Sequence, residues 1–400
     1  MYKAEDITRY YTSKSSENYG LMIFGSLVFF LFSPSLILLT SPVIRELLLL
    51  LGLLVLIYSY FSLFRSRQYS VRFGFIALFL SATYLAILSL ANGHTGFDFR
   101  YFYLLTKAAV FFLAAYELSQ ARFSFALIPL FFYILCIILG FITLFRFMSI
   151  GEVGRLDLES DHFHAVGLGI NYSTVTVLFL LISMRVRKSL AMLAIPIVFL
   201  SFGISMYTAS RGPILALVFS GLFAFWLNKS YRHFFPILIT LFSFLFLIEL
   251  TSIGDQLSFV YERFSGSNSN ANLDNYSSGR VTIYREYINT LFANSKSMLM
   301  GVQFYDVNNY PHNLFLEIVL RFGFLNLFLC SFVSLFLMFK IWSRKTELIS
   351  SDFGQMTLVL LVYSLILSMF NSNIEQNFIL FFSAGALVGF FDSAPNKLPQ

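Results

Sequence analysis

The sequence predicts an all-α integral membrane protein, and three observations lead to this class. First, 58% of the 400 residues are hydrophobic and only 12% are charged, whereas soluble domains average about 25% charged residues. Second, the apolar runs approach the roughly 20 residues that a helix needs to cross a bilayer. Third, these runs are longer than the alternating segments of about ten residues that barrel strands would show. The chain therefore has too little polar surface for a soluble domain, and its spans are expected to be helices.

Hydropathy divides the chain into about twelve expected spans, each an apolar run bounded by polar or charged residues. They are Leu21–Leu39, Leu47–Phe64, Phe73–Ala91, Phe102–Leu118, Phe123–Phe145, Val166–Met184, Leu190–Tyr207, Pro213–Leu227, Phe234–Leu250, His312–Ile341, Met356–Phe370 and Phe378–Phe391.

The distribution of lysine and arginine predicts the orientation. With the N-terminus inside, most basic residues fall on inner segments, and the short outer segments keep only Arg45, Arg100, Arg146, Arg155 and Arg211. This bias follows the positive-inside rule, so both termini are expected to be cytoplasmic. The net charge of +6 does not indicate nucleic acid, because the cations are spaced between spans rather than gathered into a patch.

The sequence predicts three regions: spans in residues 1–250, a large outer loop in 251–311 between the ninth and tenth spans, and further spans in 312–400. Within the loop, Ser265–Asn272 has the composition of a flexible segment. An amphipathic helix on the outer membrane face is expected next, opened by Ser277 or Ser278. Its apolar positions recur at helical spacing: Val281, Tyr284, Ile288, Leu291 and Phe292.

A second outer segment, Arg146–Ala165, carries the acidic and histidine residues Asp157, Glu159, Asp161, His162 and His164. This spacing favours a solvated loop over a divalent-cation site, so no metal is predicted. Cys136 and Cys330 both fall in apolar runs and indicate neither a disulfide framework nor a metal site.

Three basic residues on the outer side share one local setting. Arg211 precedes the eighth span, Arg280 opens the amphipathic helix, and His312 follows Pro311 at the start of the tenth span. Proline at a first helical turn predicts a helix start there. A cation beside a helix N-terminus is slightly unfavourable, by roughly 0.3–1 kcal/mol. Three such placements suggest a shared anion, because arginine forks and helix N-termini both favour phosphate. The alternatives are a snorkelling Arg211, a solvated Arg280 and a hydrogen-bonded cap at His312.

Other polar residues near this end are weaker candidates. Glu317 and Arg321 have the i,i+4 spacing of an ion pair, which favours a structural pair facing the protein interior. Gly323 would allow close helix approach. Arg285, Lys107 and Glu317 are further candidates for substrate binding, although membrane-interface snorkelling is the simpler explanation for Lys107.

These motifs resemble a known family. Ser210-Arg211-Gly212, Ser278-Gly279-Arg280 and Pro311-His312-Asn313-Leu314-Phe315-Leu316-Glu317 with Gly323 resemble the O-antigen ligase and polymerase superfamily, the Wzy/WaaL type. The resemblance covers about Ser205 to Lys340, and the first half matches only in hydropathy.

The resemblance implies a GT-C-like glycosyltransferase at the periplasmic face of the bacterial inner membrane. The implied donor is a glycan on undecaprenyl diphosphate, transferred with inversion and without a metal or other cofactor. Arg211, Arg280 and His312 match the functional basic residues of the family. We expect the arginines to contact the diphosphate, and His312 to take the acceptor proton or bind phosphate. The usual carboxylate base has no clear match here, so its assignment stays open.

The first hypothesis is a polymerase of lipid-linked repeat units. The alternatives are an O-antigen ligase, which uses a lipid A-core acceptor, and a flippase for the same lipid-linked sugars. The acidic Arg146–Ala165 segment favours the polymerase over the ligase. Cations concentrated at one membrane face favour a glycosyltransferase over a flippase. A chain-length regulator and a flippase are candidate partners.

Overall fold

The computed structural model describes residues 165–185, 198–203, 205, 211–229, 280–301, 313–370 and 377–392, with several helical positions between 108 and 119. In these residues every secondary-structure element is a helix, which confirms the all-α prediction for this part of the chain. The labelled helices are α6 (Ala165–Arg185), α8 (Arg211–Asn228), α12 (Arg280–Leu291), α13 (Ser295–Met300), α14 (Leu314–Ser343), α15 (Lys345–Ser350), α16 (Asp352–Phe370) and α17 (Phe378–Asp392).

Most of the expected helices that can be compared with the structure are present, and the differences lie mainly at their ends. The expected spans Val166–Met184, Pro213–Leu227 and Phe378–Phe391 correspond to α6, α8 and α17. The expected amphipathic helix corresponds to α12. The largest difference is in α16, which begins at Asp352 rather than Met356 because Ser351 and Asp352 start the helix with polar residues. The short helix α15 was not predicted.

Two helices, α14 and α16, are long and apolar enough to cross a membrane. Shorter apolar helical stretches cover Tyr172–Leu181, Gly212–Asn228 and Ile379–Asp392. The count of twelve spans and the orientation stay predictions. The expected spans Leu21–Leu39, Leu47–Phe64, Phe73–Ala91, Phe123–Phe145 and Phe234–Leu250 lie outside the described residues, as do the loop segments 146–164 and 251–279.

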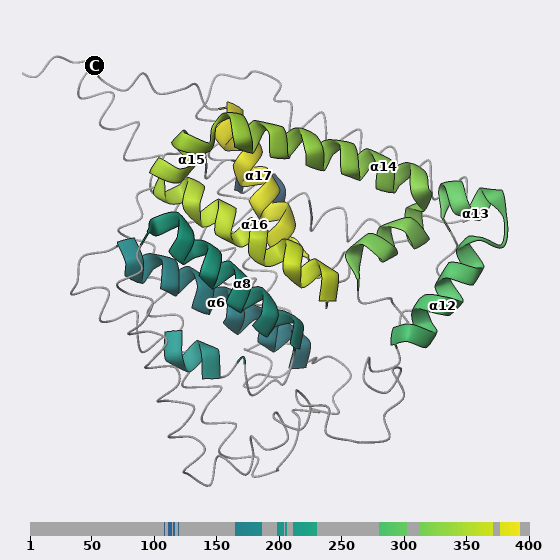
Figure 1. The fold of residues 1–400 in the computed structure, drawn as a ribbon, viewed down its shortest axis with the longest axis horizontal. Coiled ribbons are helices and arrows are strands. Elements are labelled where there is room, and N and C mark those ends of the chain that lie inside the picture. Colours follow the sequence, from purple (N-terminus) through teal and green to yellow (C-terminus); the bar gives the residue numbers. More distant parts are fainter. Residues whose placement is uncertain are drawn as a thin grey trace, which may run out of the picture.

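The main core lies between α6, α8 and α16, which lie side by side (Figure 1). A buried hydroxyl pair joins two of them, since the Tyr363 hydroxyl bonds Ser173 and donates to the Ile170 carbonyl oxygen at 3.1 Å. Ser173 lies in the first half of α6 and Tyr363 in the second half of α16, so this contact joins the two helices within their lengths. Hydroxyls between apolar helices give such contacts specificity, because the apolar faces are alike.

Helix α17 packs on the helical segment around residues 111–119 through two glycines spaced four apart. A side chain at Gly385 would overlap the Phe112 carbonyl, and one at Gly389 would overlap Ser119. Small residues at i and i+4 let helix backbones approach closely, which is how apolar helices gain packing energy in membranes. Tyr116 also donates a hydrogen bond to Asp392 at 3.0 Å.

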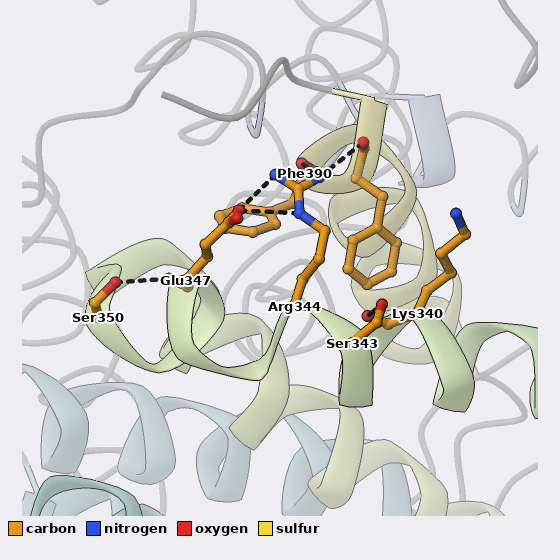
Figure 2. Close-up of polar contacts among 7 residues, drawn as sticks. Lys340, Ser343, Arg344, Glu347, Ser350 and Phe390 are labelled. Atoms are coloured by element: carbon orange, nitrogen blue, oxygen red, sulfur yellow. Dashed lines mark hydrogen bonds and ion pairs between the residues drawn. The ribbon is translucent and has the colours of Figure 1, made fainter. Parts of the chain in front are cut away.

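One end of α14 is held by an arginine (Figure 2). The Arg344 Nε donates to Glu347 at 2.9 Å, and its Nη1 donates to the Phe391 carbonyl oxygen at 2.9 Å. The guanidinium also lies 5.5 Å from the centre of the Phe390 ring. The last carbonyls of a helix lack intrahelical partners, so Arg344 caps the C-terminus of α17 and links it to α14 and α15.

The tenth predicted span forms a helix that is broken at Gly323. Gly323 has φ 75° and ψ 176°, a conformation that side-chain-bearing residues rarely adopt. The break divides α14 into a short arm, 314–322, and a long apolar segment, 324–343 (Figure 1). The helix over this stretch was predicted, but the break was not, because hydropathy is continuous across it.

Candidate functional site

The arm of α14 is where the predicted site residues can be compared with the structure. The helix begins later than expected: Asn313 is its N-cap, with φ −141° and ψ 117°. Pro311 and His312 therefore precede the helix, which corrects the prediction that Pro311 marks its first turn. The physical reason is the Asn313 side chain, whose Oδ1 accepts from the Leu316 N–H at 3.1 Å.

Glu317 and Arg321 form a buried ion pair on this arm. The Arg321 Nη2 lies 2.8 Å from the Glu317 Oε1, and the two side chains are 7% and 0% exposed. The predicted structural pairing is therefore confirmed. Ionic groups among apolar helices are expensive unless paired, so this pair restrains the rotamers of both buried residues within the arm. A role for Glu317 in substrate binding stays a prediction.

The predicted outer-loop helix α12 packs against the same arm. Leu291, at the end of α12, is buried with Val319 and Leu320 of the arm. The Phe292 ring lies 6.1 Å from the Phe324 ring, just beyond the break in α14. Figure 1 shows α12 and α13 beside the broken end of α14. The part of the outer loop that the structure describes is thus attached to the arm.

The contact between α13 and α14 depends on two glycines. Gly301 follows α13 with φ 88°, and a side chain there would overlap the Arg321 carbonyl. A side chain at Gly323 would overlap the Leu299 carbonyl. Residues 299–301 and 321–323 therefore pass backbone against backbone. The sequence indicated Gly323 as a point of close approach, and the structure identifies α13 as its partner.

The two candidate arginines lie where the motifs predicted, at helix starts. Arg211 is the first residue of α8, and Arg280 is the first residue of α12. Neither first turn contains an acidic residue. The first N–H groups of a helix and its macrodipole favour an anion at such positions.

The structure describes some of the remaining predicted site residues and not others. Arg285 is exposed on α12. Lys107 and His312 lie outside the described residues. The structure attaches α12, which carries Arg280 and Arg285, to the arm that carries Glu317. The convergence of Arg211, Arg280 and His312 on one ligand stays a prediction.

The start of α14 also meets the end of α16. The Asn313 Nδ2 donates to the Met369 carbonyl oxygen at 3.2 Å, in the last turn of α16. The preceding residue, Ser368, accepts a hydrogen bond from the Asn377 Nδ2 just before α17. Sequence reasoning missed this role of Asn313. The preference for asparagine at helix starts was the signal that could have revealed the cap, although not the bond to α16.

Among the described residues, no group of three or more histidine, cysteine, aspartate or glutamate side chains is arranged to hold a metal ion. The Asp157–His164 cluster lies outside those residues. Comparisons with protein-family models, with curated proteins and with solved structures find no match.

Proposed function

We propose that this chain is a glycosyltransferase that polymerises oligosaccharide repeat units carried on undecaprenyl diphosphate. It would act at the periplasmic face of the bacterial inner membrane, with both termini in the cytoplasm. The observation that carries the proposal is the position of the motif residues at helix starts. Arg211 begins α8, Arg280 begins α12, and His312 lies one residue before the N-cap of α14.

The reaction explains why basic residues at helix starts would be used. An acceptor hydroxyl oxygen forms a bond to the anomeric carbon of the donor glycan. The bond from that carbon to the diphosphate oxygen breaks, and the diphosphate leaves with the bonding electrons. The acceptor proton passes to a base, for which His312 is the candidate. Negative charge grows on the leaving diphosphate, and preorganised donors placed there are worth about 3–4 kcal/mol each.

The same donor handling would serve an O-antigen ligase, for which the acceptor is lipid A-core. The acidic segment Arg146–Ala165 favours the polymerase over the ligase. A ligase is expected to carry extra basic residues on the outer side, because its core acceptor is phosphorylated. A flippase for the same lipid-linked sugars needs a cationic cavity between similar halves rather than cations at one face.

A deletion strain examined by lipopolysaccharide gel separates these functions. Loss of a polymerase leaves lipid A-core with a single repeat unit. Loss of a ligase leaves bare core while polymer accumulates on undecaprenyl diphosphate, and loss of a flippase leaves bare core without polymer. Chains of normal length in the deletion strain would exclude all three.

The site is tested by complementing that strain with Arg211→Ala, Arg280→Ala and His312→Ala. Each is expected to abolish polymer while the protein remains in the membrane. Lys296→Ala is the matched control, because Lys296 is an exposed basic residue on α13 in the same outer loop. It is expected to give normal polymer. Normal polymer from any two of the three site variants would contradict the assignment.

A further inference from the structure

Asn313 uses both ends of its side-chain amide. The Oδ1 accepts from the Leu316 N–H at 3.1 Å, and the Nδ2 donates to the Met369 carbonyl oxygen at 3.2 Å. A helix cap needs only an acceptor, which aspartate, serine or threonine supplies equally well. The donor half of the amide therefore does something that capping does not require.

The bond to Met369 joins two groups that would otherwise lack partners within their own helices. The last four carbonyls of a helix have no intrahelical donor, and Met369 lies in the last turn of α16. The neighbouring Ser368 accepts a hydrogen bond from the Asn377 Nδ2. Asn377 comes directly before α17, as Asn313 comes directly before α14. Adjacent residues at the end of α16 thus each bind an asparagine that comes just before another helix.

The rest of the arm is already held. At its far end, the backbone around Gly323 is in contact with α13. The contact to Met369 holds the opposite end of the arm, where the chain enters the helix. His312 is the residue before Asn313, with its Cα about 3.8 Å away across one peptide bond. A displacement of the Asn313 cap therefore moves the His312 backbone with it.

We propose that Asn313 is a positioning residue: its amide holds the start of α14 against the last turn of α16, and the peptide bond to the preceding residue in the sequence, His312, passes this restraint on. This inference rests on the proposed function, because the expected effect of Asn313 is on glycosyl transfer involving His312. Asn313 itself touches neither donor nor acceptor in this role. Loss of this restraint is expected to reduce the transfer rate, because misplacement of a reacting group by about 1 Å can reduce a rate about 100-fold.

Asn313→Ser is the decisive variant, because serine keeps a cap acceptor and loses the donor to Met369. Asn294→Ser is its matched control. Asn294 caps α13 in the same outer region, with its Oδ1 accepting from the Ser297 N–H at 2.7 Å. The same substitution at both positions therefore changes the same type of cap, and only at Asn313 does it also remove a hydrogen bond to a second helix.

The activity test uses the purified full-length protein with a lipid-linked glycan as donor. Asn313→Ser is expected to lower kcat by about 10-fold to 100-fold while the donor KM changes less than about 3-fold, since positioning acts on the chemical step. Asn294→Ser is expected to retain wild-type kcat. A wild-type kcat for Asn313→Ser, or an equal loss in both variants, would overturn the positioning role.

A second measurement does not depend on activity. Nitroxide labels at Phe315→Cys and Leu365→Cys, both exposed positions in the wild type, are introduced with Cys136 and Cys330 replaced by serine. Asn313→Ser is expected to broaden the label–label distance distribution, and Asn294→Ser is expected to leave it unchanged. An unchanged distribution in Asn313→Ser would overturn the inference. If the wild-type protein transfers no glycan but the distribution broadens, the proposed function fails and the placement of the helix start by Asn313 is retained.

Discussion

Gly301 and Gly323 lie in reciprocal contact, and neither position has room for a side chain. A Cβ at Gly301 would lie 2.7 Å from the Phe322 nitrogen, and one at Gly323 would lie 2.6 Å from the Met300 nitrogen. Both residues also have positive φ, at 88° and 75°. The contact attaches the outer-loop helices to the broken arm of α14, so residues from two predicted regions of the chain form one structural unit.

Gly323→Ala is expected to destabilise the protein strongly. The positive φ alone costs about 1–3 kcal/mol for a residue with a side chain, and the new methyl group would overlap the Leu299 carbonyl. The measurement is the midpoint of thermal unfolding in detergent. Gly221→Ala is the control, because a Cβ there meets only Leu180 Cδ2 at 3.7 Å, an ordinary contact. Equal midpoints for the two variants would contradict the crowding at Gly323.

Removing one partner of the Glu317–Arg321 pair is expected to be worse than removing both. Glu317→Ala leaves a buried guanidinium without its carboxylate, and breaking a buried pair in this way costs about 3–5 kcal/mol. The double variant Glu317→Leu with Arg321→Met replaces the pair by apolar side chains and should recover most of that loss. Thermal unfolding of the single and double variants measures the difference. Additive losses in the double variant would show that the two residues do not interact.

Tyr363→Phe is expected to weaken the packing of α16 on α6, although the side chain keeps its ring and loses only the hydroxyl. The variant loses the hydrogen bonds to Ser173 and to the Ile170 carbonyl, and bonds of this kind between membrane helices are worth about 0.6–2 kcal/mol. A double-mutant cycle with Ser173→Ala measures the part of that energy which the two hydroxyls share. A coupling energy of zero would mean that the two hydroxyls contribute independently.

Sequence reasoning predicted the helices better than their ends and interruptions. Uninterrupted apolar runs located α6, α8 and α17, and apolar residues at helical spacing located α12. The break at Gly323 was not predicted, because the hydropathy of an apolar residue is the same in a continuous helix and in a broken one. Gly301, the partner of Gly323 in this contact, belongs to a different segment of the sequence. Only tertiary packing brings the two glycines close together.

The candidate site was predictable to a similar extent. The motifs placed Arg211 and Arg280 at helix starts, and the spacing of Glu317 and Arg321 predicted their ion pair. The start of α14 was predicted too early, because Pro311 gave a stronger signal than Asn313. The bond from Asn313 to Met369 joins residues 56 positions apart. No local pattern encodes a contact of that separation.

Arg344→Ala is expected to destabilise the end of α17 more than Glu347→Gln does. Glu347→Gln removes only a partly exposed ion pair, worth about 0.2–1 kcal/mol. Arg344→Ala removes that pair and also the donors to the Phe390 and Phe391 carbonyls, where each hydrogen bond from a charged group contributes about 1.5–3 kcal/mol. Amide hydrogen exchange in the last turn of α17 distinguishes the two variants. Exchange that is equally fast in both would show that Arg344 stabilises α17 only through Glu347, and that the carbonyl contacts contribute nothing.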